Sequence, residues 1–430
     1  MPIRLNFTNT RSPTLSIPLD LADVTILDAY LDDQGTCQIT VESTVDHVLC
    51  HGCGQVITAS HGYGEPVTVR HLAVWGRPTY VTLHPRRFVC PHCSSPGQTV
   101  TTTQTVTWRQ AGSPHTHAYE DHVLLELVNS TLEDVGRKEG LTSDAVQGLL
   151  ERRITTTVQW SEFERLTVIG IDEIACKKGH RDFVAILTTR LEGRTHLLAV
   201  LPNREKATVK QFLDAIPQSL RRTIRTVCTD MWDGYVNAVR ESLQADPECQ
   251  VELVVDRFHV AEHYYEAADT LRKQEMKRLK KELPAETYEQ FHGVMWLFRH
   301  RAADLRPDDQ ARLEQLFSYA PALQVAYTLR EKLTALFDAP LSKEDALQQI
   351  TAWSAEVQAS GLNCFNKFLT TLTNWRDEIL NYFPQRQTSG FVEGFNNKVK
   401  VLKRRCYGLF KAGHIFQRLY LDLEGYRLFT

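Results

Sequence analysis

Two apolar runs that each end in an aspartate constrain the fold of this chain more than any other feature of its sequence. Residues 166–172 have the sequence LTVIGID and residues 223–230 have TIRTVCTD, so Asp172 and Asp230 each stand where a buried strand should stop. Apolar runs of this length, rich in β-branched residues, predict strands of an α/β sheet. Carboxylates at the carboxyl ends of such strands lie where ligands bind, and two of them can hold a hard divalent cation.

The segment from about 164 to 260 predicts a mixed α/β sheet. Its patterns place strands at 166–172, 181–188, 195–201, 223–229 and 251–255, and helices at 206–216 and 233–243. Three strands in sequence, followed by a helix, a strand, a helix and a strand, favour a mixed sheet over an all-parallel one. Asp256 and His259 follow the last strand, which brings an acid and an imidazole to the same edge. His259 could equally be an ordinary residue at the start of a helix.

Each acid also has a structural interpretation. An aspartate at a strand end can be only a turn former or a helix cap, and Asp233 is placed to cap the helix 233–243. Glu173 would point to the opposite face of the sheet if its strand continued past Asp172. Two aspartates that open at one sheet edge nevertheless favour a shared cation site.

Two Cys-x-x-Cys pairs predict a structural zinc site. The chain has ten cysteines, and four of them form the pairs Cys50/Cys53 and Cys90/Cys93. Each pair can deliver two thiolates from one turn, and four thiolates complete the tetrahedron that structural Zn²⁺ prefers. The 36 residues between the pairs exceed the roughly 15–20 of a compact ribbon, so a strand-rich insertion must fill the gap. The alternative is four free thiols on turns.

The first 160 residues divide into two predicted modules. Residues 1–107 contain an N-terminal hairpin, with alternating strands at 25–32 and 37–42 around a turn, followed by the zinc-binding module. Residues 118–160 change to a helical period and suggest a helix-turn-helix with a turn at 139–142. Its second helix, 143–153, would enter a DNA major groove, and the residues expected to face DNA are Gln147, Arg152 and Arg153. Any helical hairpin can show the same pattern, so the assignment depends on its context.

The remaining sequence is helical in period. Residues 261–385 are charged, contain leucines at helical intervals and predict an all-helical insertion. Residues 386–430 contain Glu393 at the start of a further helix and then a basic run. The run is expected to neutralise DNA phosphates, although it could be a solvated helix face. It consists of Lys398, Lys400, Lys403, Arg404 and Arg405.

Composition excludes several classes of protein. A hydrophobic content of 42% with 23% charged residues is ordinary for a folded soluble chain. A formal net charge of -3 argues against a simple cationic coat for nucleic acid. The N-terminus does not resemble a signal peptide, and no run approaches the length of a membrane span. We therefore expect a cytoplasmic protein that does not associate with membranes.

Four segments together resemble the catalytic segments of bacterial insertion-sequence transposases of the ISL-three family. They are Gly170–Asp172, Thr229–Met231, Asp256–Val260 and Glu393–Lys400. The resemblance covers nearly the whole chain. It implies an α/β multidomain protein in which a zinc-binding β module and a helix-turn-helix precede an RNase H-like mixed sheet of the DDE type, interrupted by an all-helical insertion at 261–385.

The resemblance also implies site residues and an activity. Asp172, Asp230 and Glu393 would hold catalytic Mg²⁺ or Mn²⁺, and Asp256 with His259 would form an accompanying Asp-x-x-His motif. Such a protein is expected to bind the inverted repeats that end an insertion sequence, cut there, and join the freed 3′-hydroxyl ends to target DNA by two-metal phosphoryl transfer. Because two double-stranded DNA ends must be brought together, a homodimer or higher assembly is expected, associated with the bacterial nucleoid.

Two other classes remain open. A regulator built from a zinc module and a helix-turn-helix would bind DNA without needing the acidic triad. A nuclease of the same fold would cut DNA without joining it. Loss of cellular function on replacing Asp172 would argue against the regulator, and strand-transfer products would argue against the nuclease.

Overall fold

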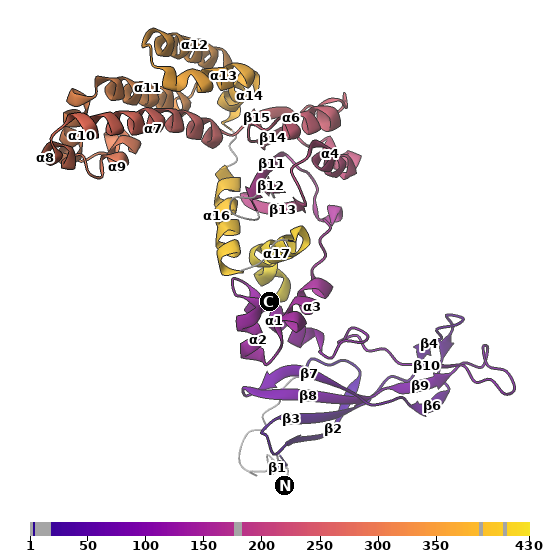
Figure 1. Cartoon of the computed structure of the whole chain (residues 1–430). Coiled ribbons are helices and arrows are strands. Elements are labelled where there is room, and N and C mark those ends of the chain that lie inside the picture. Colours follow the sequence, from indigo (N-terminus) through magenta and orange to yellow (C-terminus); the bar gives the residue numbers. More distant parts are fainter. Residues whose placement is uncertain (1–2, 5–18, 176–182, 387–389, 407–410) are drawn as a thin grey trace. The chain divides into compact units, whose positions relative to one another are not determined.

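The computed structural model describes residues 3–4, 19–175, 183–386, 390–406 and 411–430, without the side chains of residues 3–4, 390–394 and 396. The chain forms two compact units (Figure 1). Unit 1 comprises Met1–Ile154 and Leu421–Thr430, and unit 2 comprises Thr155–Tyr420. No helix among the described residues is long and apolar enough to cross a membrane.

A five-stranded sheet forms the first part of unit 1. Its strand order is β1 (Ile3–Arg4), β2 (Val24–Leu31), β3 (Cys37–Ser43), β8 (Arg77–His84) and β7 (Val67–Val74). The hairpin β2–β3 confirms the predicted alternating strands, and Gly35 in its turn has a positive φ of 78°. Ile39, Val41 and Val81 alternate into a core that also contains Trp108.

Two strands of this sheet come from the part of the chain that lies between the two cysteine pairs. The segment between the two cysteine pairs contains β7 and β8, and β8 pairs parallel with β3 of the N-terminal hairpin. The predicted strand-rich insertion is therefore confirmed, but it joins the hairpin in one sheet instead of forming a separate module. Smaller sheets surround the cysteines, formed by β10 (Thr101–Thr103), β9 (Arg86–Val89) and β6 (Ser60–Tyr63), and by β4 (Val48–Leu49) and β5 (Val56–Ile57).

Three helices complete the first stretch of unit 1: α1 (His117–Leu127), α2 (Leu132–Glu139) and α3 (Ser143–Arg153). Each begins at a threonine, Thr116, Thr131 or Thr142, whose hydroxyl accepts a backbone N–H of the first turn. Gly140 ends α2 in the left-handed conformation, at φ 64°. The carbonyl oxygen of Leu141 approaches Gly136 so closely that a Cβ there would lie 2.7 Å from it. The sharp α2–α3 turn therefore depends on both glycines.

The last helix, α17 (Ala412–Phe429), runs from unit 2 into unit 1, where its final turns join the helices α1–α3. Asp422 accepts a hydrogen bond from the backbone N–H of Asn129, at 2.8 Å between N and Oδ1. Gly425 is where α17 meets Val128, because a Cβ there would lie 2.6 Å from a Val128 methyl carbon. Residues almost 300 positions apart thus share one core.

A mixed five-stranded sheet is the centre of unit 2. Its strands are β11 (Val168–Ala175), β12 (Phe183–Leu191), β13 (Arg194–Leu201), β14 (Thr226–Thr229) and β15 (Glu252–Val255). The order is β13-β12-β11-β14-β15, with antiparallel pairing from β13 to β11 and parallel pairing from β11 to β15. All five predicted strands are confirmed, although residues 181–182 lie outside the described part of the chain.

Helices α4 (Lys206–Ala215), α5 (Gln218–Arg221) and α6 (Asp233–Val239) connect the strands, and α6 ends in a π-helical turn, Arg240–Gln244. Leu213 and Val239 are buried with the strand residues Ile169, Leu187 and Val227. This alternation of strands and helices is the mixed α/β sheet predicted from the sequence.

Only helices occupy the described chain from Arg257 to Gln385. They run from α7 (Arg257–Glu282) through α8 (Ala285–Glu289), α9 (Val294–Arg299), α10 (Pro307–Tyr319), α11 (Pro321–Asp338), α12 (Lys343–Ala359), α13 (Asn366–Asn374) and α14 (Arg376–Leu380) to α15 (Tyr382–Gln385). Their core holds a fully buried arginine, Arg330, whose guanidinium lies over the rings of Tyr327 and Tyr265, at 4.3 and 4.9 Å from the ring centroids.

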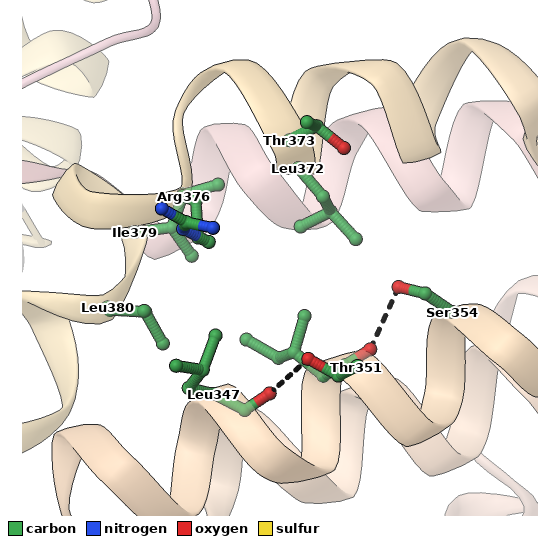
Figure 2. Close-up of a pocket in the computed structure, with 9 residues that line it drawn as sticks. Leu347, Thr351, Ser354, Leu372, Thr373, Arg376, Ile379 and Leu380 are labelled. Atoms are coloured by element: carbon green, nitrogen blue, oxygen red, sulfur yellow. Dashed lines mark hydrogen bonds between the residues drawn. The ribbon is translucent and has the colours of Figure 1, made fainter.

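A cavity of about 230 Å³ lies between α12, α13 and α14 (Figure 2). The hydroxyls of Thr351 and Ser354 donate to backbone carbonyls one turn earlier, at 2.7 and 2.8 Å. Most other lining groups are aliphatic, as Leu347, Leu372 and Ile379 illustrate. The volume is below the roughly 300–1,000 Å³ of small-molecule pockets, so we interpret it as a packing gap.

Helix α16 (Gly390–Arg405) returns the chain to the mixed sheet, where it packs against β11 and β13 (Figure 1). Val399 and Leu402 are fully buried on its inner side. The Lys403 ammonium donates to the carbonyl oxygen of Ala175, the last residue of β11. The helix that contains Glu393 is therefore fixed beside the strand that contains Asp172.

Candidate active site and zinc centre

The pairing register of the mixed sheet brings Asp172 and Asp230 level with each other. Strands β11 and β14 are parallel and align Gly170 with Cys228, so the residues two positions further along are Asp172 and Asp230. Asp230 follows the last residue of β14, as predicted. Asp172 does not end its strand, because β11 continues to Ala175 through its antiparallel pairing with β12. The prediction that Asp172 closes a strand was wrong, yet the two acids share one sheet edge.

Asp230 is buried beside other carboxylates. Burial, and then the nearby carboxylates of Glu173 and Asp172, raise the pKa of Asp230 from 3.8 to about 7, while His259 and Arg204 act in the opposite direction. Its Oδ1 is buried and has no hydrogen-bond partner. A buried carboxylate oxygen without a donor, beside a second carboxylate, is the donor set that Mg²⁺ or Mn²⁺ prefers. The residues present therefore fit a hard divalent cation.

Asp172 and Asp256 are both buried, with 6% and 3% of their surface exposed. Asp172 Oδ1 accepts a hydrogen bond from the backbone N–H of Glu173, at 2.6 Å. Asp256 follows β15 and caps α7, since its Oδ1 accepts the backbone N–H of Phe258 at 2.9 Å. Its own N–H donates to the carbonyl of Thr229, which fixes it beside Asp230. Asp256 thus has a clear structural role at the predicted edge.

The other two predicted catalytic residues, His259 and Glu393, lie on helices α7 and α16. His259 is half-buried in the first turn of α7, 3.9 Å from Glu262, and its charge favours ionisation of Asp230. Glu393 lies in the first turn of α16, the helix that packs against β11. The side chain of Glu393 is outside the part of the molecule that the structure describes, so its meeting with the two aspartates stays a prediction.

The sequence patterns do not predict a cluster of side chains that surrounds Glu173. Because β11 continues past Asp172, the side chains of Asp172 and Glu173 point to opposite faces of the sheet. The two carboxylate oxygens of Glu173 lie 2.7 and 2.8 Å from Arg204 Nη1. The Arg204 guanidinium lies over the rings of Phe183 and Trp232, at 4.2 and 4.0 Å from their centroids. No local pattern marks Arg204, because it lies in the loop between β13 and α4.

The four paired cysteines meet as predicted. Their sulfur atoms all lie within 4.8 Å of one another, with 3.9 Å between Cys50 and Cys93 and 3.7 Å between Cys53 and Cys90. Sulfur ligands about 2.3 Å from a tetrahedral Zn²⁺ stand about 3.8 Å apart. They are the only such group of cysteine, histidine and acidic side chains within the described chain. The module is therefore a zinc site, and its four sulfur ligands suit a structural ion.

The turns around the cysteines favour thiolate. Backbone N–H groups of Cys53 and Gly52 point at the sulfur of Cys50 and lower the pKa of that thiol to about 6. The neighbouring sulfurs of Cys53 and Cys90 raise the pKa of Cys93 to about 12. Four thiolates this close repel one another, so their joint ionisation needs a cation. A Cβ on Gly52 would lie 3.3 Å from Cys93 Sγ, which explains the small residue in this knuckle.

The predicted DNA-contacting residues of α3 have protein partners. Arg152 and Arg153 each lie 3.2 Å from a carboxylate oxygen of Glu120, which is fully buried, and Arg153 also pairs with Asp121. Hydrogen bonds from Ser113 and both arginines outweigh burial and hold the pKa of Glu120 below its usual value. Gln147 is half-buried and donates to Glu151 at 2.9 Å. Arg152 and Arg153 therefore have a structural role in addition to any contact with DNA.

The basic run lies on α16. Lys400 and Arg404 are exposed, while Lys398, Lys403 and Arg405 are half-buried. Lys403 is occupied by the Ala175 carbonyl. Lys400 and Arg404 are therefore the two side chains of the basic run that are most accessible to solvent.

Comparison with known proteins agrees with this geometry. A profile of the ISL-three (ISL3) DDE transposase matches residues 169–419, and a profile of the zinc finger of IS204/IS1001/IS1096/IS1165 transposases matches residues 46–109. The transposase of insertion sequence IS1001 from Bordetella parapertussis is 26% identical over 400 residues, covering 92% of this chain and 93% of the relative. The transposase of IS1557 from Mycobacterium tuberculosis is 24% identical over 356 residues, covering 78% and 77%. The first profile spans more than half of the chain and covers nearly all of the mixed sheet and the helices up to the middle of α17, so this protein belongs to the ISL3 family of insertion-sequence transposases.

Proposed function

We propose that this transposase binds the terminal inverted repeats of its insertion sequence, cleaves the DNA there and joins the 3′-hydroxyl ends to target DNA. The observation that carries the proposal is the pair Asp172 and Asp230, which the parallel pairing of β11 and β14 holds level with each other, together with the buried Oδ1 of Asp230, which has no hydrogen-bond partner. An RNase H-like core is supported by the strand order of the mixed sheet, three antiparallel strands followed by two parallel ones.

Three carboxylates would form the metal site: Asp172, Asp230 and Glu393. Bound there, Mg²⁺ or Mn²⁺ would activate the attacking water or 3′-hydroxyl and stabilise the leaving oxygen. Asp172 lies on β11 and Asp230 directly follows β14, and α16, the helix that contains Glu393, packs against β11 and β13. Asp256 caps the start of α7. From the first turn of that helix, the His259 imidazole would donate to a phosphate oxygen.

Binding and catalysis would use different parts of the chain. We assign recognition of the DNA ends to the zinc module and to a helix-turn-helix formed by α2 and α3, whose turn at Gly140 supports this motif. Lys400 and Arg404, exposed on α16, would neutralise phosphates beside the catalytic site. Residues 261–385 would be the helical insertion within the catalytic core.

The test is cleavage of labelled DNA from the element's own ends, with Mg²⁺ and a plasmid target. The wild type is expected to give cut ends and strand-transfer products, and both products are expected to disappear in Asp230→Asn and Glu393→Gln. Asp304→Asn, which changes an exposed aspartate of the helical segment, is the matched control. Equal cleavage by wild type and Glu393→Gln would remove Glu393 from the site.

The same assay separates the rival functions. Cleavage without joined products would indicate a nuclease, and specific binding without either product would indicate a regulator.

We also propose that a dimer or larger assembly holds the paired ends. A strictly monomeric particle on paired ends, measured by light scattering after size exclusion, would contradict this.

A further inference from the structure

Two exposed aromatic side chains stand at the edge of the sheet that carries the acids. Trp232 is 38% exposed and Phe258 is 49% exposed. Each follows an aspartate by two residues, Trp232 after Asp230 and Phe258 after Asp256. Strands β14 and β15 are parallel and align Thr229 with Val255, so both aromatic residues leave the sheet at the same edge.

The indole of Trp232 is fixed although it is exposed. The Arg204 guanidinium lies 4.0 Å from its ring centroid, and Glu173 anchors that guanidinium from the side. Gly234 makes room for the indole, because a Cβ there would lie 2.6 Å from Trp232 Nε1. The Tyr235 hydroxyl, 3.5 Å from a Glu173 oxygen, completes the support. A rigid aromatic surface left open to water is typical of a binding surface.

Phe258 is held at a fixed place by the backbone. Its N–H donates to Asp256 at the first turn of α7, and its ring meets the edge of His259, with 5.9 Å between the ring centroids. Among the described residues, neither Trp232 nor Phe258 belongs to the two apolar cores formed by the mixed sheet and the helical segment. The exposed part of each ring is therefore available to a ligand.

The chemistry of this edge identifies the occupant. Any DNA strand cut here must place its scissile phosphate beside Asp172 and Asp230, so the groups that reach Trp232 and Phe258 are parts of the flanking nucleotides. A nucleobase gains about 1–3 kcal/mol by stacking on an aromatic face, so the bases are the parts of these nucleotides that best fit the two rings. A base in duplex DNA already has both faces covered by its neighbours, so only an unpaired base can stack on these rings.

On the basis of the proposed function, we propose that Trp232 and Phe258 stack against unpaired bases next to the scissile phosphate, so that the protein separates the DNA strands locally where it cuts. The support from Glu173 and Arg204 keeps the Trp232 ring in position for this contact. Stacking of this kind is tolerant of sequence. Recognition of the element's ends would therefore stay with other parts of the protein.

The test compares Trp232→Ala and Phe258→Ala with Trp296→Ala, a control that removes a 59% exposed tryptophan from the helical segment. The substrates are element-end DNA that is fully paired and the same DNA with mismatches flanking the cleavage site. We expect each of the first two variants to cut paired DNA about tenfold more slowly, the order of one lost base stack. Mismatched DNA should restore much of that rate, because strand separation is then already achieved.

A second measurement follows the base directly. With 2-aminopurine beside the scissile phosphate, wild type and Trp296→Ala should change its fluorescence on binding, and Trp232→Ala should not. Gly234→Ala, which displaces the indole without removing it, should behave like Trp232→Ala, and Trp232→Phe should recover part of the signal. If wild type cuts paired DNA and Trp232→Ala matches Trp296→Ala in both measurements, the stacking proposal is wrong while the proposed function stands. If wild type cuts no end DNA, the proposed function itself fails.

Discussion

Replacing Asp230 by asparagine should stabilise the magnesium-free protein while abolishing its activity. Burial and the neighbouring carboxylates raise the pKa of Asp230 from 3.8 to about 7 in the folded chain. A shift of about three pH units corresponds to about 4 kcal/mol of folding free energy lost when this carboxyl ionises, at about 1.4 kcal/mol per unit. An asparagine of the same shape carries no charge and avoids this cost.

The sign and the pH window follow from linkage. Because the folded pKa is raised, the folded protein holds a proton that the unfolded chain has released between pH 3.8 and about 7, and the wild type loses stability across that window as pH rises. Above about pH 7 the cost is complete. The stability gap between Asp230→Asn and wild type should therefore be about 4 kcal/mol near pH 8 and less than half of that near pH 5.

The assay is urea unfolding of both proteins at these two pH values, followed by tryptophan fluorescence in magnesium-free buffer. Chelators are omitted, because they would also strip the zinc module. Added Mg²⁺ should stabilise the wild type and leave Asp230→Asn nearly unchanged, since the ion compensates the same charge. Asp304→Asn is the control for a generic change of charge. A variant that is less stable than wild type at pH 8, or a gap that does not change with pH, would refute the reasoning.

Three further outcomes follow from contacts described above. Cys90→Ser should lose the zinc ion, measured as metal content per chain, and open the surrounding module to proteolysis, whereas Cys37→Ser should retain the ion. Glu120→Gln should lower stability by about 3 kcal/mol in urea unfolding, because it removes the buried charge that pairs with Arg152 and leaves Arg153 with Asp121 alone. Glu133→Gln, on an exposed helix face, should cost less than about 1 kcal/mol. Gly136→Ala should destabilise the α2–α3 turn, since its Cβ would lie 2.7 Å from a backbone oxygen. Weaker binding to end DNA, measured by anisotropy, should accompany that loss.

Local patterns in the sequence were enough to predict much of this protein. Buried strands in unit 2 are short, apolar and bounded by turn residues, so each could be placed within a few residues. The cysteine spacing specified the zinc ligands, because only a turn of this length delivers two thiolates to one ion. The all-helical segment after Arg257 followed from its leucine spacing.

Features that depend on distant partners could not be predicted in this way. Whether Asp172 ends its strand is decided by the pairing of β11 with β12, and an acid in a local pattern gives no information about that partner. The ion pairs of Arg152 and Arg153 depend on Glu120, about 30 residues earlier. The Arg204 cluster joins a loop to a strand and a helix start. Each of these contacts is set by tertiary packing.

The position of α17 in the sequence has a consequence for how this protein folds during its synthesis. Asp422 and the turns that follow it belong to the same compact unit as helices α1–α3, so that unit lacks part of its core while the ribosome is still translating the intervening residues. A nascent chain therefore cannot finish folding its N-terminal unit until all of unit 2 has been synthesised. Truncated products that stop before Asp422 would carry an incomplete N-terminal unit, and they would compete poorly with full-length protein for the DNA that both should occupy.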